Sequence, residues 1–124
     1  MWTIKKSIIE DCVNSAQNVF PKEFLCFLGG NKKDQTIDEI VFLPSISGES
    51  FATINLTNMP NDTSIIGSLH SHPNGVARPS LADKRFFTRY YINIILGVNS
   101  NTNQTYSISA FDTKATSLEL KLTD

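Results

Sequence analysis

The stretch that most constrains this chain runs from residue 70 to residue 83 and reads HSHPNGVARPSLAD. It contains both histidines of the sequence, His70 and His72, which are separated by a single residue. The residues before them, 64–69, are mostly apolar and are typical of a buried strand. Because side chains two apart on a strand lie on the same face, the two imidazoles can bind one ion.

The residues after the histidines predict a loop followed by a helix that begins close to them. Pro73 removes a backbone donor and residues 74–75, Asn-Gly, favour a turn, so the strand should end directly after His72. Ser80 is a good helix N-cap, and Asp83 would be the third residue of that helix. The start of the helix can therefore return a carboxylate to the end of the histidine strand.

Two imidazoles, one carboxylate and an open fourth position describe a catalytic zinc site, whereas structural zinc sites are usually closed by four protein ligands. Taken separately, each piece has an ordinary explanation. A His-x-His pair on a strand is often only hydrogen-bonded, and Ser-x-x-Asp before an apolar run is usually only a capping box. The joint arrangement favours one zinc ion per chain, held by His70, His72 and Asp83.

These residues resemble the metal-binding signature of the JAMM (MPN+) metalloprotease family. That signature is an upstream glutamate, then His-x-His, seven residues, serine, two residues and aspartate, and His70, His72, Ser80 and Asp83 match it with the same spacing. The upstream glutamate would be Glu23. The order of elements fits along nearly the whole chain, whose small size resembles the minimal archaeal members. The resemblance implies an MPN/JAMM domain with a cytidine-deaminase-like architecture.

The rest of the chain alternates short apolar segments with two helical patterns. Residues 5–20 predict an amphipathic helix, and residues 81–90 predict a second one. The stripe expected to face the core in the first helix comprises Ile9, Cys12, Val13, Ala16 and Phe20. Strands are expected at residues 23–28, 36–43, 51–56, 64–69, 92–98 and 105–111, with 117–122 as a final strand or edge element. We therefore expect one α/β domain over residues 1–124, with a mixed, largely antiparallel curved sheet and two main helices.

The composition excludes several classes of protein. A chain of 124 residues, 40% of them hydrophobic, supports a single core. The net charge of -1 and the isoelectric point near 6.1 argue against a nucleic-acid partner. No signal-peptide pattern is present, and the apolar run at residues 90–98 is too short to span a membrane. Cys12 and Cys26 are far apart in the sequence, so we expect neither a disulfide framework nor a CxxC zinc site. A cytoplasmic monomer or homodimer is the simplest expectation.

The expected chemistry follows from the zinc site. Zinc lowers the pKa of a bound water from about 15.7 towards about 7. A carboxylate can take a proton from this water and pass it to the leaving amine. We assign this role to Glu23, because burial among apolar neighbours would raise its pKa; its alternative is an ordinary strand-end glutamate. Ser80 has two possible roles, since a helix N-cap accepts from the backbone, while the JAMM resemblance implies that its hydroxyl stabilises the oxyanion.

The resemblance also implies a substrate, because JAMM enzymes with this signature cleave after the C-terminal Gly-Gly of ubiquitin or ubiquitin-like proteins. This short chain has no room for the insertions that grip two ubiquitins, so the expected partners are conjugates of a small ubiquitin-like modifier. An extended tail would add as a strand to a sheet edge. The residues expected to contact it are Phe51, Asn55, Thr57, Met59 and Arg78.

Three other functions are compatible with a fold of this class. A zinc deaminase needs His-x-Glu and Pro-Cys-x-x-Cys around its metal, and neither motif occurs here. A non-catalytic MPN scaffold is a stronger alternative, although such domains have usually lost some ligands and all five motif positions are present in this chain. A JAMM hydrolase that processes a sulfur-carrier protein or a small conjugate is the third possibility.

Overall fold

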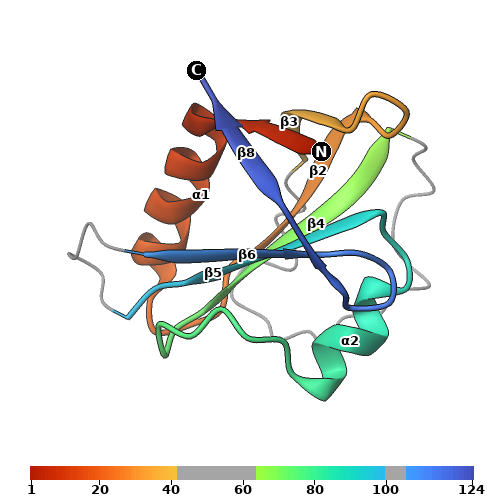
Figure 1. The fold of residues 1–124 in the computed structure, drawn as a ribbon. Coiled ribbons are helices and arrows are strands. Elements are labelled where there is room, and N and C mark those ends of the chain that lie inside the picture. Colours follow the sequence, from red (N-terminus) through yellow and green to blue (C-terminus); the bar gives the residue numbers. More distant parts are fainter. Residues whose placement is uncertain (42–63, 100–105) are drawn as a thin grey trace.

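The computed structural model describes residues 1–41, 64–99 and 106–124, which form one eight-stranded sheet with two helices (Figure 1). The helices are α1 (Lys6–Val19) and α2 (Leu81–Phe87). The strands are β1 (Trp2–Lys5), β2 (Leu25–Asn31), β3 (Thr36–Val41), β4 (Ile65–His72), β5 (Ile92–Gly97), β6 (Ser107–Phe111), β7 (Ser117–Leu118) and β8 (Leu120–Thr123). Their order in the sheet is β7-β6-β5-β4-β2-β3-β1-β8.

The sheet is mixed and strongly curved, which confirms the expected fold class. The pairs β1–β3, β1–β8 and β4–β5 are parallel, and the other four described pairs are antiparallel. Strands β7 and β8 lie at opposite edges of the sheet although only Glu119 separates them along the chain. The two edges must therefore approach each other, and the sheet is nearly closed into a barrel.

The two helices pack on opposite faces of the sheet, and β2 contributes buried side chains to both faces. Cys26 and Leu28 belong to the core beneath α1, whereas Leu25 and Phe27 pack with the aromatic residues of α2. This alternation is the two-residue period of a strand buried on both sides. Helix α1 buries the predicted stripe, with Ile9, Cys12, Val13 and Ala16 fully buried and Phe20 partly buried.

The two cysteines, which are distant in the sequence, meet in the core beneath α1. Cys12 and Cys26 are both buried and free, and their Sγ atoms lie 3.9 Å apart. The hydrogen bond with Cys12 raises the pKa of the Cys26 thiol well above its usual range, and burial acts in the same direction. Cys26 therefore stays protonated near neutral pH and packs as a small apolar side chain.

Strand boundaries at the amino-terminal end differ from the sequence-based expectation. Strand β1 was not expected, because the alternation of buried Trp2 and Ile4 is only four residues long and runs directly into α1. Strand β2 begins at Leu25 instead of residue 23 and continues through both glycines to Asn31, with a register shift against β3 between them. A side chain on Gly30 would collide with the backbone of Thr36, so glycine permits this close approach.

The carboxyl-terminal segment also differs, because the expected strand 117–122 is two short strands at opposite edges of the sheet. Nothing in the alternation of leucines indicated this change of partner. The observed β3, β4, β5 and β6 agree with the expected strands, and β4 ends directly after His72 as predicted. The expected strand at 51–56 lies outside the described residues.

Helix α2 ends at Phe87, earlier than the expected residue 90, because a buried side chain binds the carbonyl groups that follow. The Nδ2 atom of Asn93 donates to the carbonyl oxygens of Phe87 and Tyr90, both at 3.2 Å. Its Oδ1 atom accepts a hydrogen bond from the Ser68 hydroxyl at 2.6 Å. Asn93 is fully buried on β5 and thus joins β4, β5 and the end of α2.

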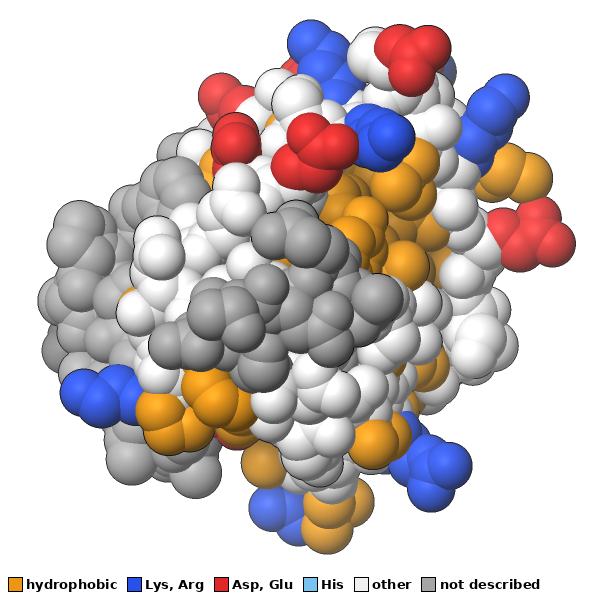
Figure 2. Space-filling view, turned by 90° about the vertical axis from the view of Figure 1, so that its left-hand side faces the viewer, with side chains coloured by type: hydrophobic (Ala, Val, Ile, Leu, Met, Phe, Trp, Pro, Cys, Tyr) orange, Lys and Arg blue, Asp and Glu red, His pale blue; other side chains and the backbone are white. Residues whose placement is uncertain are grey.

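The surface shown in Figure 2 carries charges of both signs. Acidic and basic side chains are interspersed along its upper edge, and an apolar patch lies below them. No helix in the described part of the chain is long and apolar enough to cross a membrane.

We expect Asn93→Ala to lower the free energy of unfolding by about 2–4 kcal/mol, because the buried Ser68 hydroxyl would lose its partner, the Phe87 and Tyr90 carbonyls would each lose a hydrogen bond, and a cavity would remain in the core. Chemical denaturation of the purified variant measures this change. The control is Asn18→Ala on the exposed side of α1, which should stay within about 0.5 kcal/mol of the native protein. A similarly small effect for Asn93→Ala would contradict the assigned role of this network.

Candidate metal centre

The two histidines lie at the carboxyl end of β4, a central strand of the sheet. β4 pairs with β2 on one side and with β5 on the other, and His70 lies opposite Leu25 and Ile95 in these two registers. His70 is 1% exposed, whereas His72 is partly exposed at the end of the strand. A strand held by ladders on both sides fixes the direction of both imidazoles, which lie on one face as predicted.

The carboxylate of Asp83 lies in the first turn of α2, and the predicted capping box with Ser80 is present. The Ser80 hydroxyl accepts from the backbone N–H of Asp83 at 3.1 Å, and Asp83 Oδ2 accepts from the backbone N–H of Ser80 at 2.8 Å. Asp83 is 3% exposed although it lies at the start of a helix. The cap therefore turns this carboxylate inward, towards the histidines.

The donor atoms of the three residues converge on one point. His70 Nε2 and His72 Nε2 lie 3.0 Å apart, Asp83 Oδ1 lies 3.2 Å from His70 Nε2, and Asp83 Oδ2 lies 3.0 Å from His72 Nε2. Ligands at about 2.0–2.1 Å from a tetrahedral zinc ion would lie about 3.3 Å from one another. The observed separations are close to this value, so the predicted zinc ligands fit the ion.

The protonation of His72 gives a second reason to expect a cation. His72 Nδ1 lies 2.9 Å from the carbonyl oxygen of Val76, which can only accept, so Nδ1 carries a proton. In a neutral imidazole, Nε2 then has no proton and points a lone pair at the Asp83 carboxylate. A positive charge is needed between them, supplied either by a second proton on His72 or by a metal ion.

The pKa shifts of the three residues reflect a balance between burial, which disfavours the charged forms, and the hydrogen bonds among them. Burial lowers the pKa of His70, which favours the neutral imidazole that binds metal. The hydrogen bond to Asp83 raises the pKa of His72. Burial alone would raise the pKa of Asp83, but hydrogen bonds from His70 and His72 outweigh it and hold this pKa well below its usual range. Asp83 is thus ionised throughout the physiological range.

Glu23 lies in the segment that joins α1 to β2, just before the strand begins. It is partly buried, and burial raises the pKa of its carboxyl group, the direction expected from the sequence. His72 lowers this pKa and Asp83 raises it, so Glu23 lies close enough to both metal ligands to sense their charges. The structure therefore brings the three predicted ligands together, with Glu23 within electrostatic range of two of them.

The expected substrate contacts are placed less completely. Arg78 is exposed in the loop between β4 and α2. The other expected contacts, Phe51, Asn55, Thr57 and Met59, lie outside the described residues. Two residues of the site were missed: the Val76 carbonyl, a backbone contact without a sequence signal, and Ser71, whose hydroxyl accepts from the backbone N–H of Phe24 at 2.8 Å. The position of Ser71 inside the His-x-His motif was the available signal.

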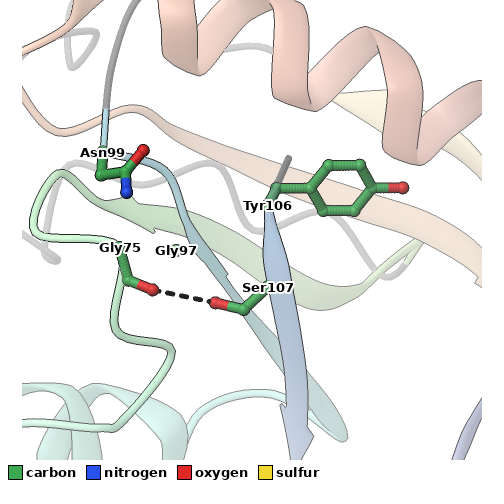
Figure 3. A pocket seen from close by; sticks show the side chains of 5 residues that line it. All are labelled: Gly75, Gly97, Asn99, Tyr106 and Ser107. Carbon is green, nitrogen blue, oxygen red and sulfur yellow. Dashed lines mark hydrogen bonds between the residues drawn. The ribbon is translucent and has the colours of Figure 1, made fainter. Parts of the chain in front are cut away.

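The loop between β4 and α2 is tied to the sheet at several points. The backbone N–H of Val98 and that of Gly75 both donate to the His72 carbonyl, at 3.0 and 3.2 Å. The Ser107 hydroxyl on β6 donates to the Gly75 carbonyl at 3.1 Å, beside a small pocket also lined by Gly97, Asn99 and Tyr106 (Figure 3). A side chain on Gly97 would collide with the Gly75 backbone, so this glycine lets the loop pack closely.

Comparison with known proteins supports the same interpretation. The family model of prokaryotic homologs of the JAB domain matches residues 5–113. A protein of Haloferax volcanii named a probable metalloprotease is 29% identical, over 76% of this chain and 64% of its own length, so this chain spans less than two thirds of that relative.

Two solved structures are similar in fold over the whole chain. One is a structure of JAMM, a metalloprotease-like zinc site in the proteasome and signalosome, with a TM-score of 0.74, 25% identity and coverage of 100% of this chain and 99% of its own. The other is a JAB1/MPN domain protein from Archaeoglobus fulgidus, with a TM-score of 0.72, 25% identity and coverage of 100% and 98%. Since the family match includes Glu23, both histidines, Ser80 and Asp83, the resemblance found in the sequence is confirmed, and the chain belongs to the prokaryotic JAB-domain family as a minimal JAMM member.

Proposed function

We propose that this protein is a zinc-dependent isopeptidase or peptidase that cleaves after the C-terminal Gly-Gly of a ubiquitin-like modifier. One observation carries the proposal: the donor atoms of two histidines and an aspartate converge on one point, and a partly buried glutamate, whose pKa burial raises, lies within electrostatic range of two of them. A scaffold domain needs neither the converging donors nor the perturbed carboxyl group, whereas hydrolysis needs both.

Each side chain has a defined task in this reaction. His70, His72 and Asp83 would hold the zinc ion, which supplies polarisation of the scissile carbonyl and a water of lowered pKa. Glu23 takes a proton from the attacking water and delivers it to the leaving amine. Burial raises the pKa of Glu23, which favours the protonated form that the second step needs.

Ser80 can act as helix cap and as oxyanion donor at the same time. A hydroxyl has one donor and two acceptor positions, and the contact with the Asp83 backbone uses only an acceptor position. The Ser80 side chain is exposed, so its proton can reach a bound substrate. The two roles considered for this residue are therefore compatible.

The substrate proposal rests on the family to which the chain belongs and on the exposed position of Arg78. The Haloferax relative is named a probable metalloprotease, and enzymes with the JAMM signature act on Gly-Gly tails. We propose that Arg78, which is exposed in the loop between β4 and α2, contacts the tail together with Phe51, Asn55, Thr57 and Met59. Because one chain supplies all the described metal donors and Glu23, we propose that the monomer is sufficient for activity.

Metal content is the first test. Protein purified without chelator should contain about one zinc ion per chain, and His70→Ala should contain little. Asp83→Asn separates the two roles of the aspartate, because asparagine keeps an acceptor oxygen for the helix cap but loses the charge. We expect a folded Asp83→Asn variant with strongly weakened zinc binding, as measured by metal analysis. Arg78→Ala is the control that should retain zinc, and a folded native protein without zinc would remove the mechanism.

Catalysis tests Glu23 directly. We expect Glu23→Gln to retain zinc and to lower kcat by at least about 100-fold, because general acid–base catalysis contributes 10²–10⁴-fold. The assay follows release of a ubiquitin-like protein from a Gly-Gly isopeptide bond, with Lys22→Ala as the neighbouring control. Zinc-loaded native protein that cleaves a generic peptide but not the Gly-Gly isopeptide would indicate a different conjugate as substrate, and absence of any cleavage would favour a scaffold.

Ser80→Ala should lower kcat by about 100-fold while zinc is retained, because one oxyanion donor is lost. The variant should also lose about 1 kcal/mol of unfolding free energy through the missing cap. Ser80→Thr keeps a hydroxyl for both contacts and should restore most of the activity. Joint loss of zinc and fold in Ser80→Ala would mean that this serine acts only as the cap.

A further inference from the structure

Ser71, the residue between the two histidines, is not a metal ligand but contacts the segment that carries Glu23. On β4 its side chain lies on the face opposite to the imidazoles, as strand alternation requires. It is fully buried. A buried hydroxyl needs a hydrogen-bond partner, and the partner found here lies beside the active-site glutamate.

Ser71 binds both backbone polar groups of Phe24. The Ser71 N–H donates to the Phe24 carbonyl at 2.9 Å, and the Phe24 N–H donates to the Ser71 hydroxyl oxygen at 2.8 Å. In a regular antiparallel pair both bonds join backbone groups, so a side chain here takes the place of a backbone acceptor. The last β2–β4 register pair is Leu25 with His70. Phe24, which precedes Leu25, thus lies immediately outside the regular β2–β4 ladder.

Glu23 lies between two fixed points of the backbone. On one side the Lys22 N–H donates to the Val19 carbonyl at 2.8 Å, in the turn that follows α1. On the other side Phe24 is held by Ser71. The side chain of Glu23 must start from this short segment and still reach the metal ligands on β4 and α2.

We propose that Ser71 is a positioning residue for Glu23: through Phe24 it sets the distance between the proton carrier and the two histidines that flank Ser71 itself. This inference rests on the proposed function. The serine belongs to the same strand as His70 and His72, so one rigid element would fix both the metal and the glutamate. A misplacement of about 1 Å can cost about 100-fold in rate.

The test compares two buried serines of β4. Ser71→Ala removes the hydroxyl that holds Phe24, whereas the control Ser68→Ala removes a fully buried hydroxyl that donates to Asn93 on β5. Ser71→Ala should retain zinc and KM within about threefold, while kcat falls by about 10- to 100-fold. Ser68→Ala should keep kcat within about twofold, even if its unfolding midpoint falls as far as that of Ser71→Ala. Ser71→Thr, which retains a hydroxyl, should recover most of the rate.

A double-mutant comparison separates positioning from general destabilisation. Ser71→Ala should reduce kcat little further when Glu23 is already Gln, since both changes remove the same contribution. Full additivity would overturn the proposal, as would an unchanged kcat in Ser71→Ala.

A measurement without substrate tests the contact itself. The Phe24 amide should exchange with solvent at least about tenfold faster in Ser71→Ala than in native protein or Ser68→Ala, as followed by NMR. Unchanged exchange would overturn the inference whether or not the enzyme is active. If native protein lacks peptidase activity but Phe24 exchanges faster in Ser71→Ala, the proposed function fails while the structural link to Glu23 stands.

Discussion

The carboxylate of Asp83 is the interaction on which the arrangement of the site depends. Its Oδ2 atom accepts from the Ser80 backbone and also faces His72, while Oδ1 faces His70. One side chain thus caps the first turn of α2 and completes the cluster of candidate metal donors. Because Asp83 is almost fully buried, the negative charge is stable only with these donors and a cation around it. Helix position and metal binding are therefore coupled through a single group.

The parts of the site differ in how firmly they are held. His70 and His72 lie on a strand with ladders on both sides, and α2 is joined to that strand through Asn93 and Ser68. Glu23 lies instead on a connecting segment between α1 and β2. The candidate metal donors thus come from regular elements, whereas Glu23, the proton carrier of the proposed mechanism, comes from a segment fixed by a few hydrogen bonds. The position of that carboxylate therefore depends on those few hydrogen bonds, including the two that join Phe24 to Ser71.

The sequence was sufficient to predict the convergence of His70, His72 and Asp83, the helix cap and the mixed sheet, because each left a local pattern. His-x-His on an apolar strand, Ser-x-x-Asp before a helix and the stripe of α1 are properties of neighbouring residues. The strand β1 and the division of the final strand at Glu119 depend on distant partners, and the early end of α2 at Phe87 depends on Asn93, whose partner Ser68 is distant in the sequence. The meeting of Cys12 with Cys26 is a tertiary contact of the same kind. Short-range patterns could not reveal any of these features.

The parallel pairing of β1 with β8 has a consequence for how the molecule assembles. This ladder joins residues 2–5 to residues 120–123, so it spans almost the entire described chain. Contacts between residues so distant form late, since loop-closure entropy must be overcome before they contribute any stability. β1 therefore lacks its outer neighbour until β8 has been synthesised. Closure of the sheet therefore depends on pairing between the two ends of the described chain.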